Sequence, residues 1–339
     1  MLKSYLYGVN EPIISVRQLT KQYQTARASG INNITFDINP GEIVAILGES
    51  GSGKSTLLKC IYGLLKVDAG QVLFNGSRVF GPDELLIPGH KDMKMVTQDF
   101  SLNIYAKVYD NIAAMLNNKD VKAKQQKTDE MMAHLNIAHL RDKKIIELSG
   151  GEQQRVAIAK ALISDTSVLL LDEPFSQVDA VLKNQLRADI KRIVAETGVT
   201  VIMVSHDPAD ALFLADQLLL IKDGQLLQKG NPAFIYNHPE HPYTAQLLGN
   251  ANILTAADAA QLGLSATGKT VSFYPEWVTL GTGFSSSRYE VVDVYYKGFY
   301  EELLLERNGV RIRAIHLNRG EHKKKDHVQA SIGKQLTFE

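Results

Sequence analysis

The chain has 339 residues, of which 45% are hydrophobic, so it is long enough for two or three domains and can bury a substantial core. Lysine plus arginine and aspartate plus glutamate number 37 each, and the resulting formal net charge of zero excludes a global field that would attract nucleic acid. The single cysteine, Cys60, cannot form an intrachain disulfide and is predicted to be a buried thiol in a protein of a reducing compartment.

The N-terminus, MLKSYLYGVN, lacks the apolar segment of a secretory signal. No apolar run approaches the roughly 18 to 20 residues needed to cross a bilayer. We therefore expect a soluble chain, which leaves room for a separate membrane partner. The densest basic run, HKKK at 322–325, is interpreted as a solvated loop rather than a nucleic-acid site, because short charge runs usually lie on the surface.

Short β-like runs separated by polar or Gly/Pro turns occupy residues 12 to 47, as in IISVRQLT, NNITFDI and EIVAIL. The period then changes, because GESGSGKSTLLKCIYGLL is a glycine-rich turn that leads into a helical run. Between about 105 and 147 the spacing stays helical, as in NIAAMLNN and TDEMMAHLNIAHL. This stretch predicts a helical insertion rather than part of a sheet.

Two apolar runs without alternation, SVLLLDEP at 167–174 and GVTVIMVSHD at 198–207, predict parallel strands that are buried on both faces. VLKNQLRADIKRIVAE lies between them as a crossover helix, so the predicted core is a doubly wound α/β sheet. HPEHPYTAQLLGN at 238–250 has the Pro and Gly content of a domain boundary. The runs beyond it, VSFYPEWVTL, YEVVDVYYKG, YEELLLE and VRIRAIH, predict a small β-rich domain.

GESGSGKS at 48–55 matches G-x-x-x-x-G-K-[ST] between a predicted strand and a predicted helix. Glycines at these positions let backbone N–H groups curl around phosphate oxygens, and the helix that follows offers its positive N-terminus. The stretch therefore predicts a nucleotide site in which Lys54 reaches the β- and γ-phosphates and Ser55 reaches Mg²⁺.

The strand VLLLDEP ends in two carboxylates, Asp172 and Glu173. A phosphate-loop ATPase needs one acid for Mg²⁺ and gains from a second one that orients or deprotonates the attacking water. Adjacent residues that leave a strand point in different directions, so we assign Asp172 to the metal and Glu173 to the water. His206, at the end of the next buried strand, is predicted to donate a hydrogen bond to the γ-phosphate. Gln98 is predicted to reach Mg²⁺ or the water through its amide.

Two adjacent glycines precede a helical run in LSGGEQQR at 148–155, although glycine inside a helix costs about 1 kcal/mol relative to alanine. Ser149 and Glu152 fit a capping box, in which each side chain satisfies a backbone N–H at the helix start. The capping box does not explain Gly150 and Gly151. Residues without side chains would let a bare helix N-terminus approach a phosphate closely, so the stretch predicts a second anion site.

Together, GESGSGKST, Gln98, LSGGEQQR, VLLLDEP, SQVD at 176–179 and His206 resemble the ordered motifs of ATP-binding cassette (ABC) ATPases, over roughly residues 12 to 250. The resemblance implies a head-to-tail dimer in which the LSGG stretch of one subunit contacts the γ-phosphate of ATP held by the other. The second subunit is either another copy of this chain or a paired cassette. The resemblance also implies that Tyr23 stacks on adenine and that Asp179 contacts the opposite phosphate loop.

The resemblance implies three sets of site residues. The catalytic set is Glu173, His206 and Gln98, and the Mg²⁺ set is Ser55, Gln98 and Asp172. The ATP-binding set is Tyr23, Gly48, Glu49, Ser50, Gly51, Ser52, Gly53, Lys54, Ser55, Thr56, Ser149, Gly150, Gly151 and Asp179.

Two stretches depart from the family pattern. The loop after Gln98 reads SLNIYAKVYDNI and lacks the Phe-Pro pair that is frequent in transporter cassettes, and the dimer loop reads SQVD rather than SALD but keeps its acid. The chain from His206 onward resembles import ATPases with a C-terminal oligonucleotide-binding-like accessory domain. Importers of polyamines, ferric iron, sulfate, molybdate and sugars share this layout, and in them the accessory domain is associated with dimer contacts and regulation, not with nucleic acid.

We therefore predict an ABC ATPase domain at 12–245, with a helical subdomain at about 100–165, and a small β-rich accessory domain at 250–339. The predicted function is the ATP-hydrolysing subunit of an ABC transporter, an importer of polyamine, ferric iron or a similar solute. Such a subunit lies at the cytoplasmic face of the membrane and acts with separate permease subunits and a solute-binding protein.

Two alternatives stay open. One is a soluble ABC ATPase of translation or DNA repair, although such proteins usually carry two cassettes or a long coiled-coil insertion. The other is a degenerate cassette that binds ATP without turnover, which the presence of Lys54, Asp172, Glu173 and His206 disfavours.

Overall fold

The computed structural model describes residues 11–23, 30–281 and 286–339, apart from the side chains of residues 180 and 181. The chain divides into two compact units, Met1–Pro232 and Ala233–Glu339. The N-terminal stretch in which no signal segment was found lies outside the described residues. Within the described part of the chain, no helix combines the length and the apolar character that a membrane span requires.

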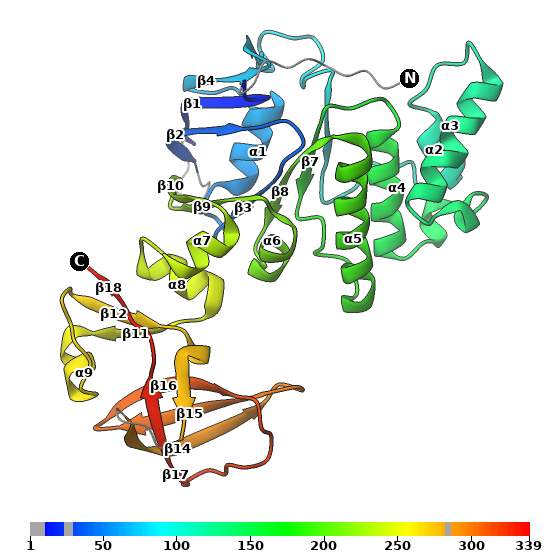
Figure 1. Ribbon diagram of the computed structural model, residues 1–339. Helices are drawn as coiled ribbons and strands as arrows, with labels where there is room; N and C mark the ends of the chain where they lie inside the picture. The colour runs from blue at the N-terminus through cyan, green and yellow to red at the C-terminus, as the bar shows by residue number, and fades with distance from the viewer. Residues whose placement is uncertain (1–10, 24–29, 282–285) are drawn as a thin grey trace. The chain divides into compact units, whose positions relative to one another are not determined.

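A six-stranded sheet forms the centre of the first unit, with the strand order β10-β9-β3-β8-β7-β6 (Figure 1). Five of its strands are parallel, and only β10 runs antiparallel, beside β9. The central strands carry the apolar runs and are buried on both faces, as the sequence pattern predicted. The strands are β3 (Ile43–Leu47), β6 (Met93–Val96), β7 (Val168–Asp172), β8 (Thr200–Ser205), β9 (Gln217–Lys222) and β10 (Gln225–Gly230).

A second, antiparallel sheet in the first unit has the order β2-β1-β4-β5. Between the two sheets lies α1 (Lys54–Tyr62), whose Leu57 and Leu58 share one core with Val44 and Ile46 of β3. On the other side of the parallel sheet, α6 (Pro208–Leu214) contacts β3 and β8. Helices therefore cover both faces, and the predicted doubly wound α/β fold is confirmed. The antiparallel strands are β1 (Ile14–Lys21), β2 (Ile31–Ile38), β4 (Ala69–Phe74) and β5 (Ser77–Arg78).

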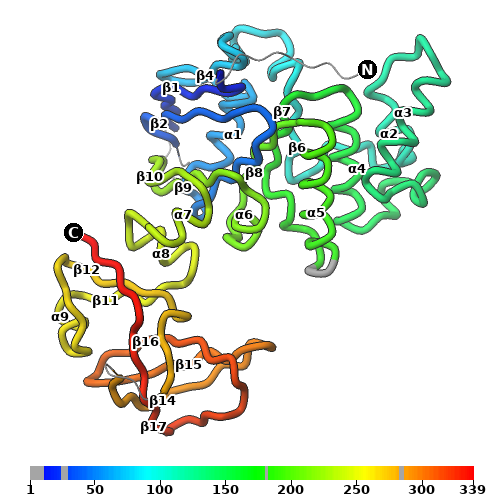
Figure 2. Tube along the Cα trace, in the orientation of Figure 1, coloured from blue at the N-terminus to red at the C-terminus, as the bar shows by residue number. Residues whose placement is uncertain are grey.

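Helices dominate the chain between β6 and β7, as the sequence predicted (Figure 2). The short helix α2 contacts both α3 and α4, and α4 packs against β6 and α5. Asp120 begins α3 by accepting a hydrogen bond from the Ala123 N–H at 3.0 Å. The helices are α2 (Val108–Ala113), α3 (Val121–His134), α4 (Gly150–Leu162) and, after β7, α5 (Ala180–Thr197).

A buried ion pair holds α4 against α5. Arg155, in the last position of the LSGGEQQR stretch, pairs with Asp189 of α5 and donates a hydrogen bond to the Leu135 carbonyl oxygen at 3.0 Å. Both charged side chains are almost fully buried, so each depends on the other. Arg192 contributes a second, half-exposed partner at 3.2 Å from Asp189.

The second unit has its own core and two sheets. A five-stranded antiparallel sheet has the order β13-β17-β14-β15-β16, and its edge strands β13 and β16 contact each other, so the sheet curls. A three-stranded sheet has the order β11-β12-β18. The strands are β11 (Asn252–Thr255), β12 (Thr270–Phe273), β13 (Val278–Leu280), β14 (Ser287–Tyr296), β15 (Glu301–Arg307), β16 (Val310–His316), β17 (His327–Ile332) and β18 (Leu336–Phe338).

Three helices accompany these strands: α7 (Pro232–Asn237), α8 (Pro242–Gly249) and α9 (Ala256–Gln261). The Tyr236 ring of α7 stacks on Tyr274 at 4.3 Å, and the Tyr274 hydroxyl donates to the Tyr236 carbonyl oxygen at 2.8 Å. These contacts explain why α7, apart from its first residue Pro232, belongs to the second unit. The domain limits inferred from sequence, 12–245 and 250–339, stay a prediction.

The thiol of Cys60 should react slowly in the folded protein. The residue is buried in the core around α1, and this burial raises the pKa of the thiol to about 12. At about pH 8 we expect iodoacetamide to label native Cys60 at least about 100-fold more slowly than in concentrated urea, because each pKa unit lowers the thiolate fraction about tenfold. Mass spectrometry of timed samples measures both rates, and equal rates would show that the thiol is accessible.

Removing one member of the buried pair should destabilise the chain. We expect Arg155→Met to lower the free energy of unfolding by about 2 to 3 kcal/mol, since Asp189 would then keep, among the described residues, only the half-exposed Arg192 and a long hydrogen bond of 3.4 Å from Gln185. Arg155→Met combined with Asp189→Leu should recover most of this loss. Urea unfolding followed by circular dichroism measures the change, with Arg192→Met as the control, expected below about 1 kcal/mol. A loss for Arg155→Met no larger than the control's would contradict the assignment.

Candidate active site

The phosphate-loop sequence forms a tight turn between β3 and α1. Gly53 precedes α1 with a φ of 101°, a left-handed conformation that favours glycine. A Cβ atom on Gly53 would lie 2.6 Å from the Gly30 carbonyl oxygen, and one on Gly48 would lie 2.2 Å from the Ile221 carbonyl oxygen. Side chains are therefore excluded at both ends of the loop. Helix α1 begins directly after Gly53, so the positive N-terminus of a helix lies at the end of the loop.

Lys54 folds back over this loop. Its side chain is only 5% exposed, and Nζ donates hydrogen bonds to the carbonyl oxygens of Gly48 at 2.9 Å and Glu49 at 2.7 Å. Burial lowers the pKa of Lys54, and the nearby acids Glu173 and Asp172 oppose this shift. Ser52 Oγ is buried without a hydrogen-bond partner among the described residues. A polyanionic ligand would satisfy both groups, so the loop fits a nucleotide phosphate chain.

Asp172 and Ser55 meet beside the loop. Ser55, in the first turn of α1, donates its hydroxyl hydrogen bond to Asp172 Oδ1 at 2.9 Å. Burial raises the pKa of Asp172, while Ser55 and two lysines oppose the shift. A hydroxyl and a half-buried carboxylate supply the hard oxygen donors that Mg²⁺ prefers, and Gln98 follows the end of the neighbouring strand β6. The residues present therefore fit this ion.

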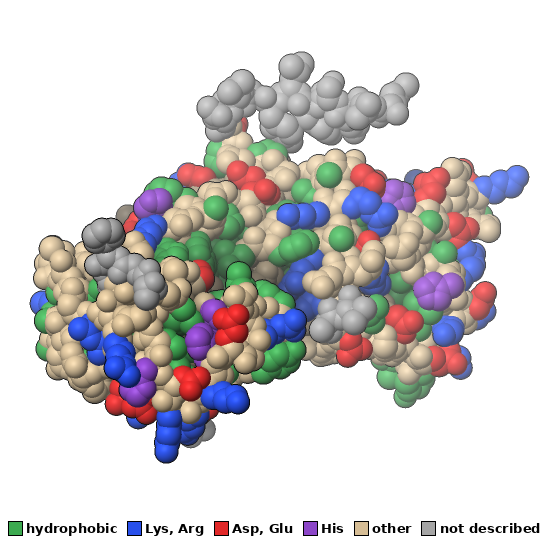
Figure 3. Space-filling model, turned by 60° about the horizontal axis from the view of Figure 1, so that its bottom comes forward, with side chains coloured by type: hydrophobic (Ala, Val, Ile, Leu, Met, Phe, Trp, Pro, Cys, Tyr) green, Lys and Arg blue, Asp and Glu red, His purple; other side chains and the backbone are tan. Residues whose placement is uncertain are grey.

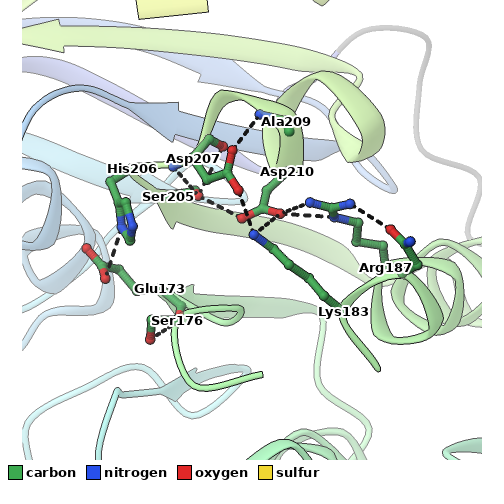
Figure 4. Close-up of polar contacts among 10 residues, drawn as sticks. Glu173, Ser176, Lys183, Arg187, Ser205, His206, Asp207, Ala209 and Asp210 are labelled. Atoms are coloured by element: carbon green, nitrogen blue, oxygen red, sulfur yellow. Dashed lines mark hydrogen bonds and ion pairs between the residues drawn. The ribbon is translucent and has the colours of Figure 1, made fainter. Parts of the chain in front are cut away.

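Glu173 points away from Asp172 toward two other side chains. Its φ of 51° is left-handed, which is uncommon outside glycine, and its N–H donates to the Val204 carbonyl oxygen of β8 at 3.1 Å. Its Oε2 lies 3.4 Å from Gln98 Nε2. The same oxygen lies 3.3 Å from His206 Nδ1, a contact that Figure 4 shows. The ends of β6, β7 and β8 thus bring the three residues assigned to catalysis into contact.

An ion-pair network holds the segment that follows His206. Lys183 Nζ of α5 lies 2.6 Å from Asp207 and 3.0 Å from Asp210, and Arg187 also pairs with Asp210 (Figure 4). Burial alone would raise the pKa of Asp207, but hydrogen bonds from Lys183 and the Ala209 N–H keep it below its ordinary value. The network ties α5 to the residue next to His206.

Sequence reasoning missed this network. The available signal was the pair of basic residues Lys183 and Arg187, four positions apart and therefore on one face of the predicted crossover helix. Two acids also follow His206 closely, at 207 and 210. Nothing in either stretch alone shows that the two faces meet.

The start of α4 is the predicted capping box. Ser149 N donates to Glu152 Oε2 at 2.8 Å, and Glu152 N donates to Ser149 Oγ at 3.4 Å. A Cβ atom on Gly150 would lie 2.9 Å from the Gln177 carbonyl oxygen, so this glycine is required by a contact within the chain. A Cβ atom on Gly151 would make only ordinary contacts, the nearest at 3.4 Å from Val178. Gly151 therefore has no such requirement.

The remaining predicted residues lie at two places. The Tyr23 hydroxyl is 3.4 Å from Thr56 Oγ1, which places this residue beside the first turn of α1. The Tyr23 side chain is partly exposed to solvent. Asp179 is exposed at the start of α5, and its side chain makes no capping hydrogen bond there.

Three comparisons bear on this site. The family profile described as "ABC transporter" matches residues 31–176. The spermidine/putrescine import ATP-binding protein PotA of Mesoplasma florum is 32% identical over 327 residues, which cover 90% of this chain and 91% of the relative. The sulfate/thiosulfate import ATP-binding protein CysA of Pectobacterium atrosepticum is 35% identical over 273 residues, covering 79% of this chain and 78% of the relative.

Among solved structures, a dimeric ATP-binding cassette in a post-hydrolysis state with bound ADP and phosphate is 28% identical. It matches with a TM-score of 0.58 over 65% of this chain and 98% of that one. The structure has a phosphate loop, three residues in contact at strand ends and a capped LSGGEQQR helix. Its named relatives are import ATP-binding proteins, one of which matches 90% of the chain. The chain therefore belongs to the ABC transporter family, as an ATP-hydrolysing subunit of the importer type.

Proposed function

We propose that this ATPase drives uptake of a polyamine or a similar small solute through separate membrane-spanning subunits. The observation that carries the mechanism is the contact of Glu173 with Gln98 and His206 beside the phosphate loop. Polyamine is favoured over sulfate because the relative named for spermidine and putrescine matches across both units, with 90% of the chain covered. Ferric iron, which is also a cation, is a second solute included in this proposal.

Binding of ATP would use the loop from Gly48 to Ser55. Backbone N–H groups surround the phosphates, Lys54 exchanges its carbonyl contacts for phosphate oxygens, and Tyr23 stacks on adenine. Ser55, Asp172 and Gln98 would hold Mg²⁺, which neutralises negative charge on the phosphate oxygens when it is bound.

Hydrolysis would depend on Glu173 as the residue that orients the attacking water and accepts its proton. The His206 ring turns Nδ1 toward Glu173, which leaves Nε2 for the γ-phosphate. Lys183 acts as a positioning residue, since it holds Asp207 and with it the backbone next to His206.

The complete site would need a second copy in a head-to-tail arrangement. The helix that begins at Ser149, Gly150 and Gly151 has an N-terminus that suits an anion. Since the phosphate loop would bind the chain's own nucleotide, this second site would serve the ATP of the partner. The exposed Asp179 would contact the partner's phosphate loop. The dimeric form of the solved cassette supports this arrangement.

Membrane subunits would bind near the loop after Gln98. Ile104 and Tyr105 are exposed in this loop, at the position where the family's usual Phe-Pro pair is missing. The chain would thus be peripheral to the cytoplasmic face of the membrane, and a separate solute-binding protein would deliver the solute.

The second candidate is a soluble ABC ATPase of translation or DNA repair. On the face in Figure 3, basic side chains lie among acidic ones rather than in one patch, which does not favour nucleic acid. Co-purification separates the two: a detergent-solubilised membrane protein as the partner supports transport, and stable association with ribosomes or DNA contradicts it.

The substitution Glu173→Gln should separate binding from turnover. We expect ATP affinity to stay within about twofold and turnover to fall at least about 100-fold, because the amide cannot accept the proton of the water. Size-exclusion chromatography with light scattering should then show an ATP-dependent dimer. The exposed Glu130→Gln is the matched control. Wild-type turnover of Glu173→Gln would show that another residue is the base.

The substitution Gly151→Val tests the proposed action on a partner's ATP. A Cβ atom at Gly151 meets only ordinary contacts with the side chains of Val178 and Leu182, so we expect the monomer to fold and to bind ATP within about twofold of the wild type. Turnover should fall at least about 100-fold, because the side chain would block the approach of the partner's phosphate. Filter binding and phosphate release measure the two effects. Loss of ATP binding together with turnover, in a variant that unfolds at the wild-type urea concentration, would refute the role.

A further inference from the structure

Three side chains with metal-ligating atoms meet in the second unit, outside the ATP site. His316 ends β16, while Glu321 and His322 lie in the segment between β16 and β17, two strands that Figure 1 labels. One ligand atom from each residue lies within 4.8 Å of the other two. His316 Nε2 is 3.0 Å from Glu321 Oε2, and the two imidazole rings have centroids 4.9 Å apart.

The spacing suits a small divalent transition metal. Zinc binds imidazole nitrogen and carboxylate oxygen at about 2.0 to 2.2 Å, so ligand atoms of one tetrahedron lie about 3.3 Å apart. The separation between His316 Nε2 and Glu321 Oε2, 3.0 Å, is close to this value, and a ligand atom of His322 lies within 4.8 Å of both. Two imidazoles and one carboxylate favour Zn²⁺ and its first-row neighbours over Mg²⁺ and Ca²⁺, which prefer oxygen ligands alone.

A buried carboxylate supports the cluster from β15. Glu301 is directly opposite His316 in the antiparallel pairing, so the two side chains share one face of the sheet. Glu301 is 6% exposed; its Oε1 accepts the Gly320 N–H at 2.9 Å, and its Oε2 has no hydrogen-bond partner among the described residues. Glu301 thus holds the backbone next to Glu321 and adds negative charge beside His316.

Basic residues flank the cluster without occupying it. Arg319 directs its guanidinium to the Tyr296 hydroxyl at 3.2 Å and the Gly298 carbonyl oxygen at 2.8 Å. Lys323, Lys324 and Lys325 are exposed, so their charges are screened by solvent and salt. Glu321 is 52% exposed, which leaves a path for an ion from solution.

We propose that His316, Glu321 and His322 form a binding site for a divalent first-row transition metal, with Zn²⁺ preferred and water in the remaining position. The site uses none of the residues assigned to ATP, so it stands or falls independently of the proposed transport function. The competing explanation is a His–Glu hydrogen bond that holds no ion.

The test uses the full chain without a histidine tag and without nucleotide. Isothermal titration with Zn²⁺ should show one equivalent bound in the micromolar range or tighter, and Co²⁺ should give the visible absorption of a four- or five-coordinate ion. We expect His316→Gln and His322→Gln each to weaken Zn²⁺ binding at least about 100-fold, and Glu301→Gln to weaken it about tenfold, as supporting groups do.

The matched control is His327→Gln, an exposed histidine at the start of β17, which should bind Zn²⁺ like the wild type. Wild-type ATP turnover and an unchanged thermal midpoint of His322→Gln without metal would show that the variant is folded. The proposal is overturned if the wild type takes up no Zn²⁺ or Co²⁺, or if the double variant His316→Gln/His322→Gln binds them as the wild type does.

Discussion

The register of the buried parallel strands is the constraint on which the ATP site depends. Leu47 pairs with Ser205, Asp172 with Val204, and Val96 with Leu171, so four strands end at one edge of the sheet. Each of these strand ends leads into a part of the site. The parts are the phosphate loop after β3, Asp172 and Glu173 at the end of β7, His206 after β8 and Gln98 after β6. Because the strands are apolar on both faces, a slip by one residue would disrupt the packing on each side, and the core therefore sets the positions of the polar residues.

Helix α5 makes ion pairs near both parts of the proposed catalytic arrangement. At its N-terminal end, Lys183 pairs with Asp207, next to His206, which is proposed to act in the chain's own site. Farther along, Asp189 pairs with Arg155 of α4, the helix whose start is proposed to face the partner's ATP. A movement of α5 would thus affect both places. The Arg155–Asp189 pair is buried and the Lys183–Asp207 pair is partly exposed, and both include charge-assisted hydrogen bonds, which are directional.

The second unit is built around a hydrophobic core of its own. Side chains from both sheets of this unit form its core. Residues of α7 and α8 pack against Tyr274 in the same unit. The basic run at 322–325 lies in a surface segment, which agrees with its interpretation as solvated. Directly before and within that run, however, His316, Glu321 and His322 converge around a supporting Glu301. The segment therefore combines a solvated side with a side that suits a cation.

Residue pattern alone was enough to predict the α/β cassette, the phosphate loop, the different directions of Asp172 and Glu173, and the capping box at Ser149. These features follow from local period, turn chemistry and the alternation of side chains, which neighbouring residues decide. Other features could be seen only once the chain was folded: the Lys183–Asp207 and Arg155–Asp189 pairs, the closeness of Gly150 to the Gln177 carbonyl oxygen, and the position of Glu301 beside the segment after His316. Each of these joins segments that are distant in the chain or on different elements, and their contact depends on how whole helices and strands pack.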